Sequence, residues 1–198
     1  MAPDERRAAL IAATVPLLHE HGLDVSTKQI ARAAGVAEGT IFGVFPDKNS
    51  LVMSALMQAL DPQPTLDALA AIDPGLDLRL RMIAAANRIH ERFTANARLM
   101  SAARMLAFTT NAHEESRERM LHSRQRLLAA LTAVIAPDAA LLRRSPEAVA
   151  RLLLLFCGAN TYGPFGDPAR HNGAEMVSLL LDGLLIRTNE NHGGAVRC

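Results

Sequence analysis

Residues 26–45 read STKQIARAAGVAEGTIFGVF, a pattern with the features of two short helices joined by a tight turn. Ser26 and Gln29 have the spacing of a capping box, which predicts that a helix covers about residues 27–34. Gly35 follows, and glycine readily takes the left-handed conformation that a sharp turn requires. This half of the stretch therefore predicts a short helix with a defined start and a defined end.

The second half of the stretch predicts another short helix, over about residues 37–44. Val36 and Ile41 are apolar and are expected to fill the space between the two helices. Two short helices connected in this way are typical of a helix-turn-helix. An ordinary pair of small core helices would give the same pattern, so these residues alone leave both interpretations open.

The remainder of the chain also has helical periodicity. Apolar residues between Leu10 and Leu18 recur every three or four positions, which predicts an amphipathic helix that ends near Gly22. A fourth helix is expected from Pro46 to about Leu60. Further helices are expected at about residues 65–72, 76–95, 97–110, 112–136, 145–162 and 173–190. No segment alternates like a strand, so we predict an all-α fold of about nine to ten helices.

Two prolines close together, in Asp61-Pro62-Gln63-Pro64, interrupt this pattern and predict a domain boundary. Residues 1–61 would then form an N-terminal three-helix helix-turn-helix domain. Residues 62–190 would form a second, C-terminal helical domain. Residues 191–198 would be a flexible tail, because chain ends rich in glycine usually fray.

The composition is that of a folded protein, with 49% apolar and 21% charged residues. Cys157 and Cys198 are too far apart in the sequence to suggest a disulfide framework or a metal-binding spacing. The N-terminal run superficially resembles a signal peptide, but acidic residues in its basic region and Pro16 argue against that. No apolar run reaches the roughly 18 residues of a membrane span. We therefore expect a cytoplasmic protein without a membrane partner.

The charge argues against a strongly basic DNA-binding surface. The net charge is +1, and residues 1–60 contain five Lys or Arg residues against six Asp or Glu residues. Proteins that bind DNA non-specifically usually carry a basic face. Any DNA binding by this segment must therefore depend on a few well-placed contacts.

A longer pattern surrounds the two short helices. It reads Arg7-x-x-Leu10-Ile11-x-Ala13, Gly22, Ser26-Thr27-x-x-Ile30-Ala31, Ala34-Gly35-Val36 and Gly39-Thr40-Ile41-Phe42-x-x-Phe45-x-x-Lys48-x-x-Leu51. Over about residues 5–60 this pattern closely resembles the TetR family of transcriptional regulators. The rest of the chain resembles the family only in its helical architecture and in residues 179–185. The resemblance implies DNA binding by residues 1–61, and effector binding and dimerisation by residues 62–190.

The resemblance also implies which residues contact double-stranded operator DNA. The recognition helix would be residues 37–44, with its first turn in the major groove. Thr40 can bond a phosphate or a base edge, and Lys48 can hold a phosphate. Thr27 would either cap its helix or contact a phosphate. The full set of expected DNA-binding residues is Thr27, Lys28, Ala37, Glu38, Gly39, Thr40, Phe42, Gly43, Val44 and Lys48.

Several of these residues depart from the family pattern. Phe42 stands where the family usually has Tyr, which removes one hydroxyl contact to phosphate. Gly43 and Val44 replace larger or polar residues that are often found there. Glu38 would either accept a hydrogen bond from a cytosine amino group or stabilise the start of its own helix. Phe45 is expected in the core, as is Leu51.

Polar groups and methionines beside apolar helix faces are the candidates for a ligand pocket. A few polar groups on apolar walls orient a ligand, and thioethers adapt to irregular cavities. A role in the core or at the surface is the alternative for each of them. The candidates are Met82, Asn87, His90, Met100, Met105, Phe108, Met120 and Asn160. We expect a small, largely hydrophobic ligand and no cofactor.

The last two predicted helices are apolar on nearly all sides, and such helices must be covered everywhere. In the family they form a four-helix bundle with a second copy of the chain, and burial within a monomer is the alternative. The expected interface residues are Leu152, Leu155, Phe156, Leu180 and Leu184. Asn160 and Asp182 interrupt the apolar surfaces, and they would fix the register of a homodimer.

The leading hypothesis is a repressor that binds a near-palindromic operator as a dimer and is released by its ligand. A DNA-binding regulator without an effector is the alternative. A small helical enzyme lacks support, because no catalytic constellation or phosphate-binding loop is present. We expect no metal site, since His113, Glu114, Glu115, Glu118 and His122 do not share one helix face.

Overall fold

A computed structural model provides the structure of the protein. It describes the backbone of residues 3–109, 114–161 and 171–184, and the side chains of residues 3–106, 117–158 and 171–182. The predicted tail at residues 191–198 lies outside the described residues. None of the described helices is long and apolar enough to cross a membrane.

The described residues form helices and no strand, which confirms the all-α prediction. The N-terminal elements are α1 (Pro3–His21), η1 (Gly22–Asp24), α2 (Thr27–Ala34), α3 (Glu38–Phe42) and α4 (Lys48–Ala59). The following elements are α5 (Gln63–Ala70), α6 (Leu78–Ala95), α7 (Ala97–Thr109), α8 (Glu114–Ile135), η2 (Ala136–Leu141), α9 (Pro146–Thr161) and α10 (Gly173–Leu184).

The start of α5 differs from the expectation. Gln63 and Pro64, predicted to lie in a break, form the first turn of the helix. Proline is tolerated there because the first N–H groups of a helix have no partner within it. The side chain of Asp61 also accepts a hydrogen bond of 3.1 Å from the N–H of Gln63. The linker after α4 is therefore only three residues long, from Leu60 to Pro62.

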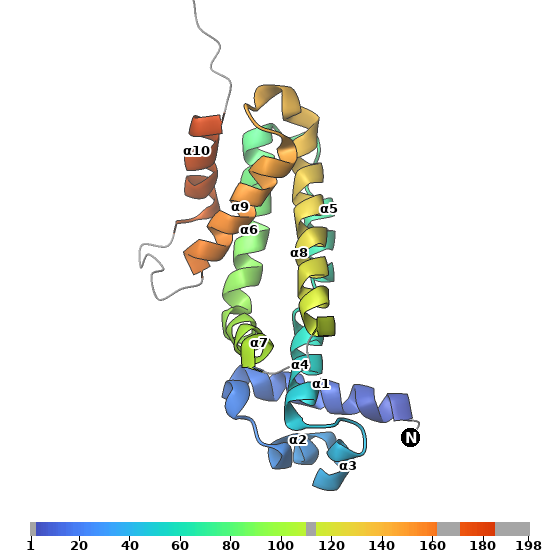
Figure 1. Ribbon diagram of the computed structural model, residues 1–198. Coiled ribbons are helices and arrows are strands. Elements are labelled where there is room, and N and C mark those ends of the chain that lie inside the picture. Colours follow the sequence, from blue (N-terminus) through green and yellow to red (C-terminus); the bar gives the residue numbers. More distant parts are fainter. Residues whose placement is uncertain (1–2, 110–113, 162–170, 185–198) are drawn as a thin grey trace, which may run out of the picture.

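The molecule is elongated, with α2 and α3 at one end (Figure 1). Helices α6 and α8 run side by side along its length, and α9 and α10 pack on the same side of the molecule against α6. Helix α4 begins near α2 and α3 and extends toward the lower ends of α6 and α8. This helix thus spans the region between the two parts of the molecule.

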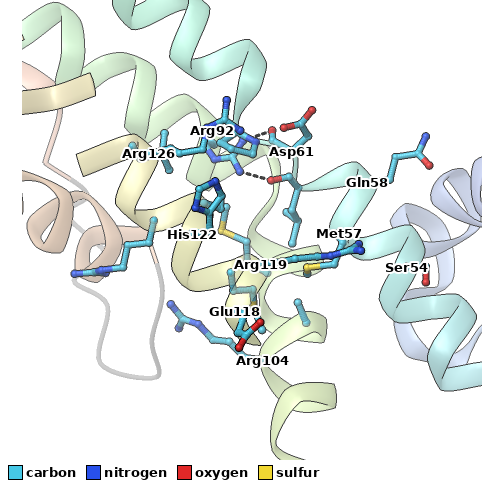
Figure 2. A pocket seen from close by; sticks show the side chains of 18 of the residues that line it. Ser54, Met57, Gln58, Asp61, Arg92, Arg104, Glu118, Arg119, His122 and Arg126 are labelled. Atoms are coloured by element: carbon cyan, nitrogen blue, oxygen red, sulfur yellow. Dashed lines mark hydrogen bonds between the residues drawn. The ribbon is translucent and has the colours of Figure 1, made fainter. Parts of the chain in front are cut away.

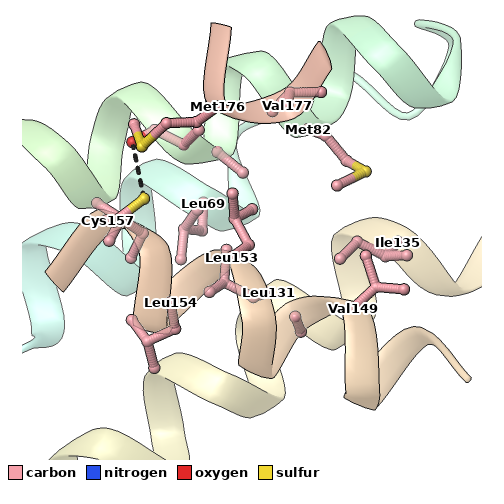
Figure 3. Close-up of a cluster of buried hydrophobic side chains, with 14 of the residues drawn as sticks. Leu69, Met82, Leu131, Ile135, Val149, Leu153, Leu154, Cys157, Met176 and Val177 are labelled. Atoms are coloured by element: carbon pink, nitrogen blue, oxygen red, sulfur yellow. Dashed lines mark hydrogen bonds between the residues drawn. The ribbon is translucent and has the colours of Figure 1, made fainter. Parts of the chain in front are cut away.

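Two clusters of buried apolar side chains hold these helices together. One cluster joins α5, α6, α8, α9 and α10, and includes Met82 and Cys157 (Figure 3). The other joins α1, α2, α3 and α4, and here Ile41, Phe45 and Leu51 are almost fully buried, which confirms the last two as core residues. Four residues of α7, Leu99, Ala102, Ala103 and Leu106, belong to the N-terminal cluster. Helix α7 therefore packs on the N-terminal helices although it follows residue 61.

Candidate nucleic-acid interface and neighbouring cavity

The start of α2 is held by the predicted capping box. The Ser26 hydroxyl accepts from the backbone N–H of Gln29 at 3.2 Å, and the Gln29 side chain accepts from the Ser26 N–H at 2.7 Å. Both bonds satisfy donors that a helix start leaves without partners. Ser26 is thus the cap, and the alternative that Thr27 caps the helix is wrong.

The turn between α2 and α3 depends on Gly35. Its φ is +67° and its ψ is +30°, the left-handed conformation that the sequence predicts. The Gly35 N–H donates to the Arg32 carbonyl at 3.2 Å, and the Val36 N–H donates to the Ala31 carbonyl at 3.0 Å. These bonds end α2 and turn the chain into α3. Ile41 of α3 is then fully buried against α2.

A hydrogen bond between side chains links α2 and α3 beside this turn. The Thr27 hydroxyl donates to a Glu38 carboxylate oxygen at 2.5 Å. Thr27 begins α2 and Glu38 begins α3, so the bond links the first turns of the two helices. A partner for Glu38 in α2 was not among the roles expected from the sequence.

Lys48 begins α4, directly after Asp47, whose side chain caps the helix by accepting from the Ser50 N–H at 2.7 Å. The Lys48 ammonium donates to the Leu23 carbonyl at 2.9 Å. An ammonium group has three donors, so this bond leaves donors that a phosphate can accept from. Lys48 therefore lies at a helix start with its charge held toward η1.

The predicted DNA-binding residues gather at the end of the molecule formed by α2, α3 and the start of α4 (Figure 1). Five of them are exposed, and these are Lys28, Ala37, Gly39, Phe42 and Gly43. The other five are half-buried, and these are Thr27, Glu38, Thr40, Val44 and Lys48. The Phe42 ring is 54% exposed, which is unusual for so large an apolar side chain.

A cavity of about 810 Å³ lies where α1 and α4 meet α6, α7 and α8 (Figure 2). This volume is within the range of small-molecule sites, roughly 300–1,000 Å³. Met100 and Met120, two of the predicted pocket residues, line the cavity. Ser54, Met57 and Gln58 of α4 also line it, so one helix connects the cavity with the end that carries Lys48.

The other predicted pocket residues lie elsewhere or outside the described side chains. Met82 is fully buried in the C-terminal core, and Met105 is 59% exposed. Asn87 is exposed and lies against Gly173. His90 is half-buried, with its Nε2 atom 3.4 Å from the Thr94 hydroxyl. The side chains of Phe108 and Asn160 are outside the described residues.

The sequence interpretation missed the arginines of the cavity. Arg92 of α6, Arg104 of α7, and Arg119 and Arg126 of α8 all line it. Arginines on amphipathic helices usually form solvated faces, and nothing in a single helix shows that these side chains meet. Their gathering depends on how three helices pack together.

Helices α9 and α10 expose apolar side chains of the predicted interface. Leu152 is 42% exposed and Leu155 is 50% exposed, whereas Phe156 and Leu180 are half-buried. Leu179, which the prediction omitted, is 60% exposed. The side chain of Leu184 lies outside the described residues. Helices α9 and α10 contact each other, so these exposed leucines lie on adjacent helices, and the interface stays a prediction.

Asp182 does not stand isolated on this surface. It forms an ion pair of 3.1 Å with Arg79 of α6, and it also accepts from the Ser178 hydroxyl at 3.1 Å. Asp182 therefore has partners within its own chain, and its role in fixing the register of a dimer stays a prediction.

Among the described side chains no three His, Cys, Asp or Glu residues group as metal ligands, and the side chains of His113, Glu114 and Glu115 lie outside that set.

Comparisons with known proteins agree with this geometry. The model for bacterial regulatory proteins of the tetR family matches residues 10–55. The chain is 40% identical over 87 residues to the HTH-type transcriptional regulator BetI of Escherichia coli O45:K1 (strain S88), covering 41% of this chain and 44% of that protein. It is 49% identical over 59 residues to BetI of Ectopseudomonas mendocina (strain ymp), covering 28% of this chain and 30% of that protein. The chain thus aligns with less than half the length of these curated relatives.

The whole fold has counterparts among solved structures. A TetR transcription regulator from Haloarcula marismortui superposes with a TM-score of 0.65 and 20% sequence identity, covering 92% of this chain and 100% of that one. At this identity the likeness concerns the fold. The capping box, the left-handed Gly35 and the family match all fall within one segment of the chain. Residues 10–55 of this chain thus match the model of the tetR family, and they contain the helix-turn-helix that α2 and α3 form.

Proposed function

We propose that this chain is a one-component transcriptional regulator of the cytoplasm. In this proposal a homodimer represses transcription by binding a near-palindromic operator, and a small molecule in the cavity releases it from DNA. The chain acts as a binding protein and not as an enzyme. The observation that carries the proposal is the exposed end of the molecule formed by a TetR-family helix-turn-helix.

The DNA contacts in this proposal come from residues of α2, α3 and α4. Thr40 and the exposed Phe42 ring of α3 face the major groove, and the ring provides apolar contact with thymine methyl groups. Lys28 and Lys48 contact phosphates on either side. Because residues 1–60 carry no excess of positive charge, shape and apolar contact provide most of the specificity.

The dimer in this proposal forms through α9 and α10. Leu152, Leu155 and Leu179 are large apolar side chains left in solvent by a single chain. Burial of apolar surface contributes about 25 cal/mol per Å², so covering these leucines with the same helices of a second copy favours association. A twofold axis through this contact places two recognition helices on one face of the DNA.

The coupling between ligand and DNA runs through α4 in this proposal. The helix begins at Lys48, close to the DNA, and three of its later residues line the cavity. Its 12 residues span about 18 Å as one rigid element. A ligand that shifts the end of α4 therefore changes the position of its start. Ligand and DNA then weaken each other's binding reciprocally.

Selection of DNA by the purified full-length chain tests the proposal. Random duplexes are incubated with the protein at low salt, recovered and sequenced over several rounds. We expect enrichment of two inverted half-sites whose centres are about 34–36 Å apart along the DNA. The Phe42→Asp variant is the control, since the exposed ring can be replaced without disturbing the core. No enrichment by the wild type, or the same enrichment by this variant, contradicts the proposal.

A further inference from the structure

The cavity carries a local excess of positive charge. Among its described lining residues are six arginines and two carboxylates, whereas the whole chain has a net charge of +1. The arginines are Arg7, Arg92, Arg104, Arg119, Arg124 and Arg126, and the carboxylates belong to Asp61 and Glu118. Like charges gathered in one concave site attract an anion and repel a cation.

Apolar side chains form another part of the cavity wall, which also includes the polar residues Ser54, Gln58, His122 and Ser123. Phe93 of α6, Met100 of α7, Met120 and Leu127 of α8, and Leu154 of α9 contribute to it. A ligand that fits both walls must combine an anionic group with an apolar body. This differs from the largely hydrophobic ligand expected from the sequence.

Two of the arginines reach the linker after α4 and the first residue of α5. Arg92 donates to the carbonyl of Leu60 at 2.5 Å and to that of Asp61 at 2.9 Å, as the dashed lines in Figure 2 show. Arg126 of α8 donates to the side-chain oxygen of Gln63 at 2.5 Å. All three of these acceptors are uncharged, and among the described residues no carboxylate forms an ion pair with Arg126.

We propose that the cavity binds an organic anion with an apolar body, and that Arg92 and Arg126 hold its anionic group. A carboxylate or phosphate accepts stronger, charge-assisted hydrogen bonds from a guanidinium than a carbonyl or amide oxygen does. The identification of this anion as the effector rests on the proposed function. Binding of the anion draws Arg92 away from Leu60 and Asp61, and so loosens the end of α4 from α6.

Calorimetric titration of the full-length chain with four ligands, each with a chain of ten carbon atoms, tests the charge preference. The anionic ligands are decanoate and decyl phosphate, and the comparison ligands are decanol and decyltrimethylammonium. We expect at least one anion to bind about tenfold more tightly than decanol, and the cation to bind more weakly still. Binding of decanol or of the cation at least as tight as that of both anions overturns the proposal.

Two substitutions test whether Arg126 holds the anionic group. Arg126→Gln is expected to weaken binding of the preferred anion about tenfold and to leave decanol binding unchanged. Arg88→Gln is the matched control, because Arg88 lies on α6, pairs with Glu91 at 3.2 Å and is absent from the cavity wall. An unchanged anion affinity in Arg126→Gln, or an equal loss in Arg88→Gln, contradicts the site.

The same proteins, measured on a DNA duplex, separate this inference from the proposed function. If the chain binds the duplex but prefers neither anion, the anion site is wrong and the regulator remains. If the chain binds the anion through Arg126 but binds no duplex, the regulator is wrong and the site remains. If both bind, the preferred anion must lower the affinity for the duplex. An unchanged affinity contradicts the loosening of α4.

Discussion

The Thr27 hydroxyl donates a hydrogen bond of 2.5 Å to the Glu38 carboxylate, and so joins the first turn of α2 to the first turn of α3. A five-residue helix such as α3 has too few internal bonds to be stable alone. Its position therefore depends on contacts with α2, of which this bond and the buried Ile41 are two. The bond also gives the negative charge of Glu38 a partner within the protein.

A double-mutant cycle measures this coupling. Thr27→Val and Glu38→Ala should each lower the free energy of unfolding by about 1 kcal/mol, because each removes a partly buried hydrogen bond. The double variant should lose less than the sum, since the bond can be lost only once. Urea denaturation followed by circular dichroism provides the values. Strictly additive losses would show that the two side chains do not interact.

A pair of glycine substitutions tests the turn. Gly35→Ala should lower the free energy of unfolding by about 1 kcal/mol, because an alanine Cβ is strained at a φ of +67°. Gly39 has no such φ, and a Cβ there meets nothing within 4 Å. Gly39→Ala should therefore leave stability unchanged or raise it by up to about 1 kcal/mol. Equal losses in both variants would contradict the left-handed turn.

Lys48→Ala tests the phosphate contact. The affinity of this variant for every duplex should fall by a similar factor, and the slope of log K against log salt should decrease by about one. The substitution also removes the bond to the Leu23 carbonyl, so folding is checked by the melting temperature. Lys48→Arg keeps the charge and should keep the slope. A slope in Lys48→Ala equal to that of the wild type argues against a phosphate at this position.

A charge placed on α9 tests the dimer. Leu155→Glu puts a carboxylate where we expect an apolar contact with a second copy, so the variant should sediment as a monomer. Leu141→Glu is the matched control, because Leu141 of η2 is 51% exposed, like Leu155 at 50%. The control should sediment as a dimer. If both variants remain dimeric, α9 is not the interface.

Burial raises the pKa of the Cys157 thiol from 9.0 to about 12. The thiolate is the reactive form, so in a Cys198→Ser background iodoacetamide should leave the native protein unmodified at pH 8 and modify it in urea. The unfolded chain releases this proton first as the pH rises. The contribution of the thiol to stability is thus complete below about pH 9 and declines toward pH 12. Rapid labelling of the native protein would show that Cys157 is accessible.

Features that depend on neighbouring residues could be predicted from the sequence. The Ser26 cap, the Gly35 turn and the burial of Phe45 each follow from a few adjacent positions. Met82 and Met100 show where such prediction ends. Both are methionines on apolar helix faces, yet one is buried in the C-terminal core and the other lines the cavity. The sequence of one helix does not reveal which neighbour its face contacts.

Contacts between distant segments were out of reach for the same reason. Asp182 pairs with Arg79, a residue 103 positions away. Arg126 meets Gln63 across 63 positions, and Arg92 reaches Leu60 across 32. In each case the sequence shows a polar residue on a helix, and only the packing of the helices supplies its partner. The charge of the cavity could therefore not be predicted.

Hydroxyl-radical footprinting of the selected duplex, with the stoichiometry measured by sedimentation, tests whether a dimer of this chain lays two recognition helices on DNA. We expect two chains for each duplex and two protected segments on one face of the DNA, with centres about 34–36 Å apart. A monomeric protein that protects no segment of any duplex at low salt would contradict it.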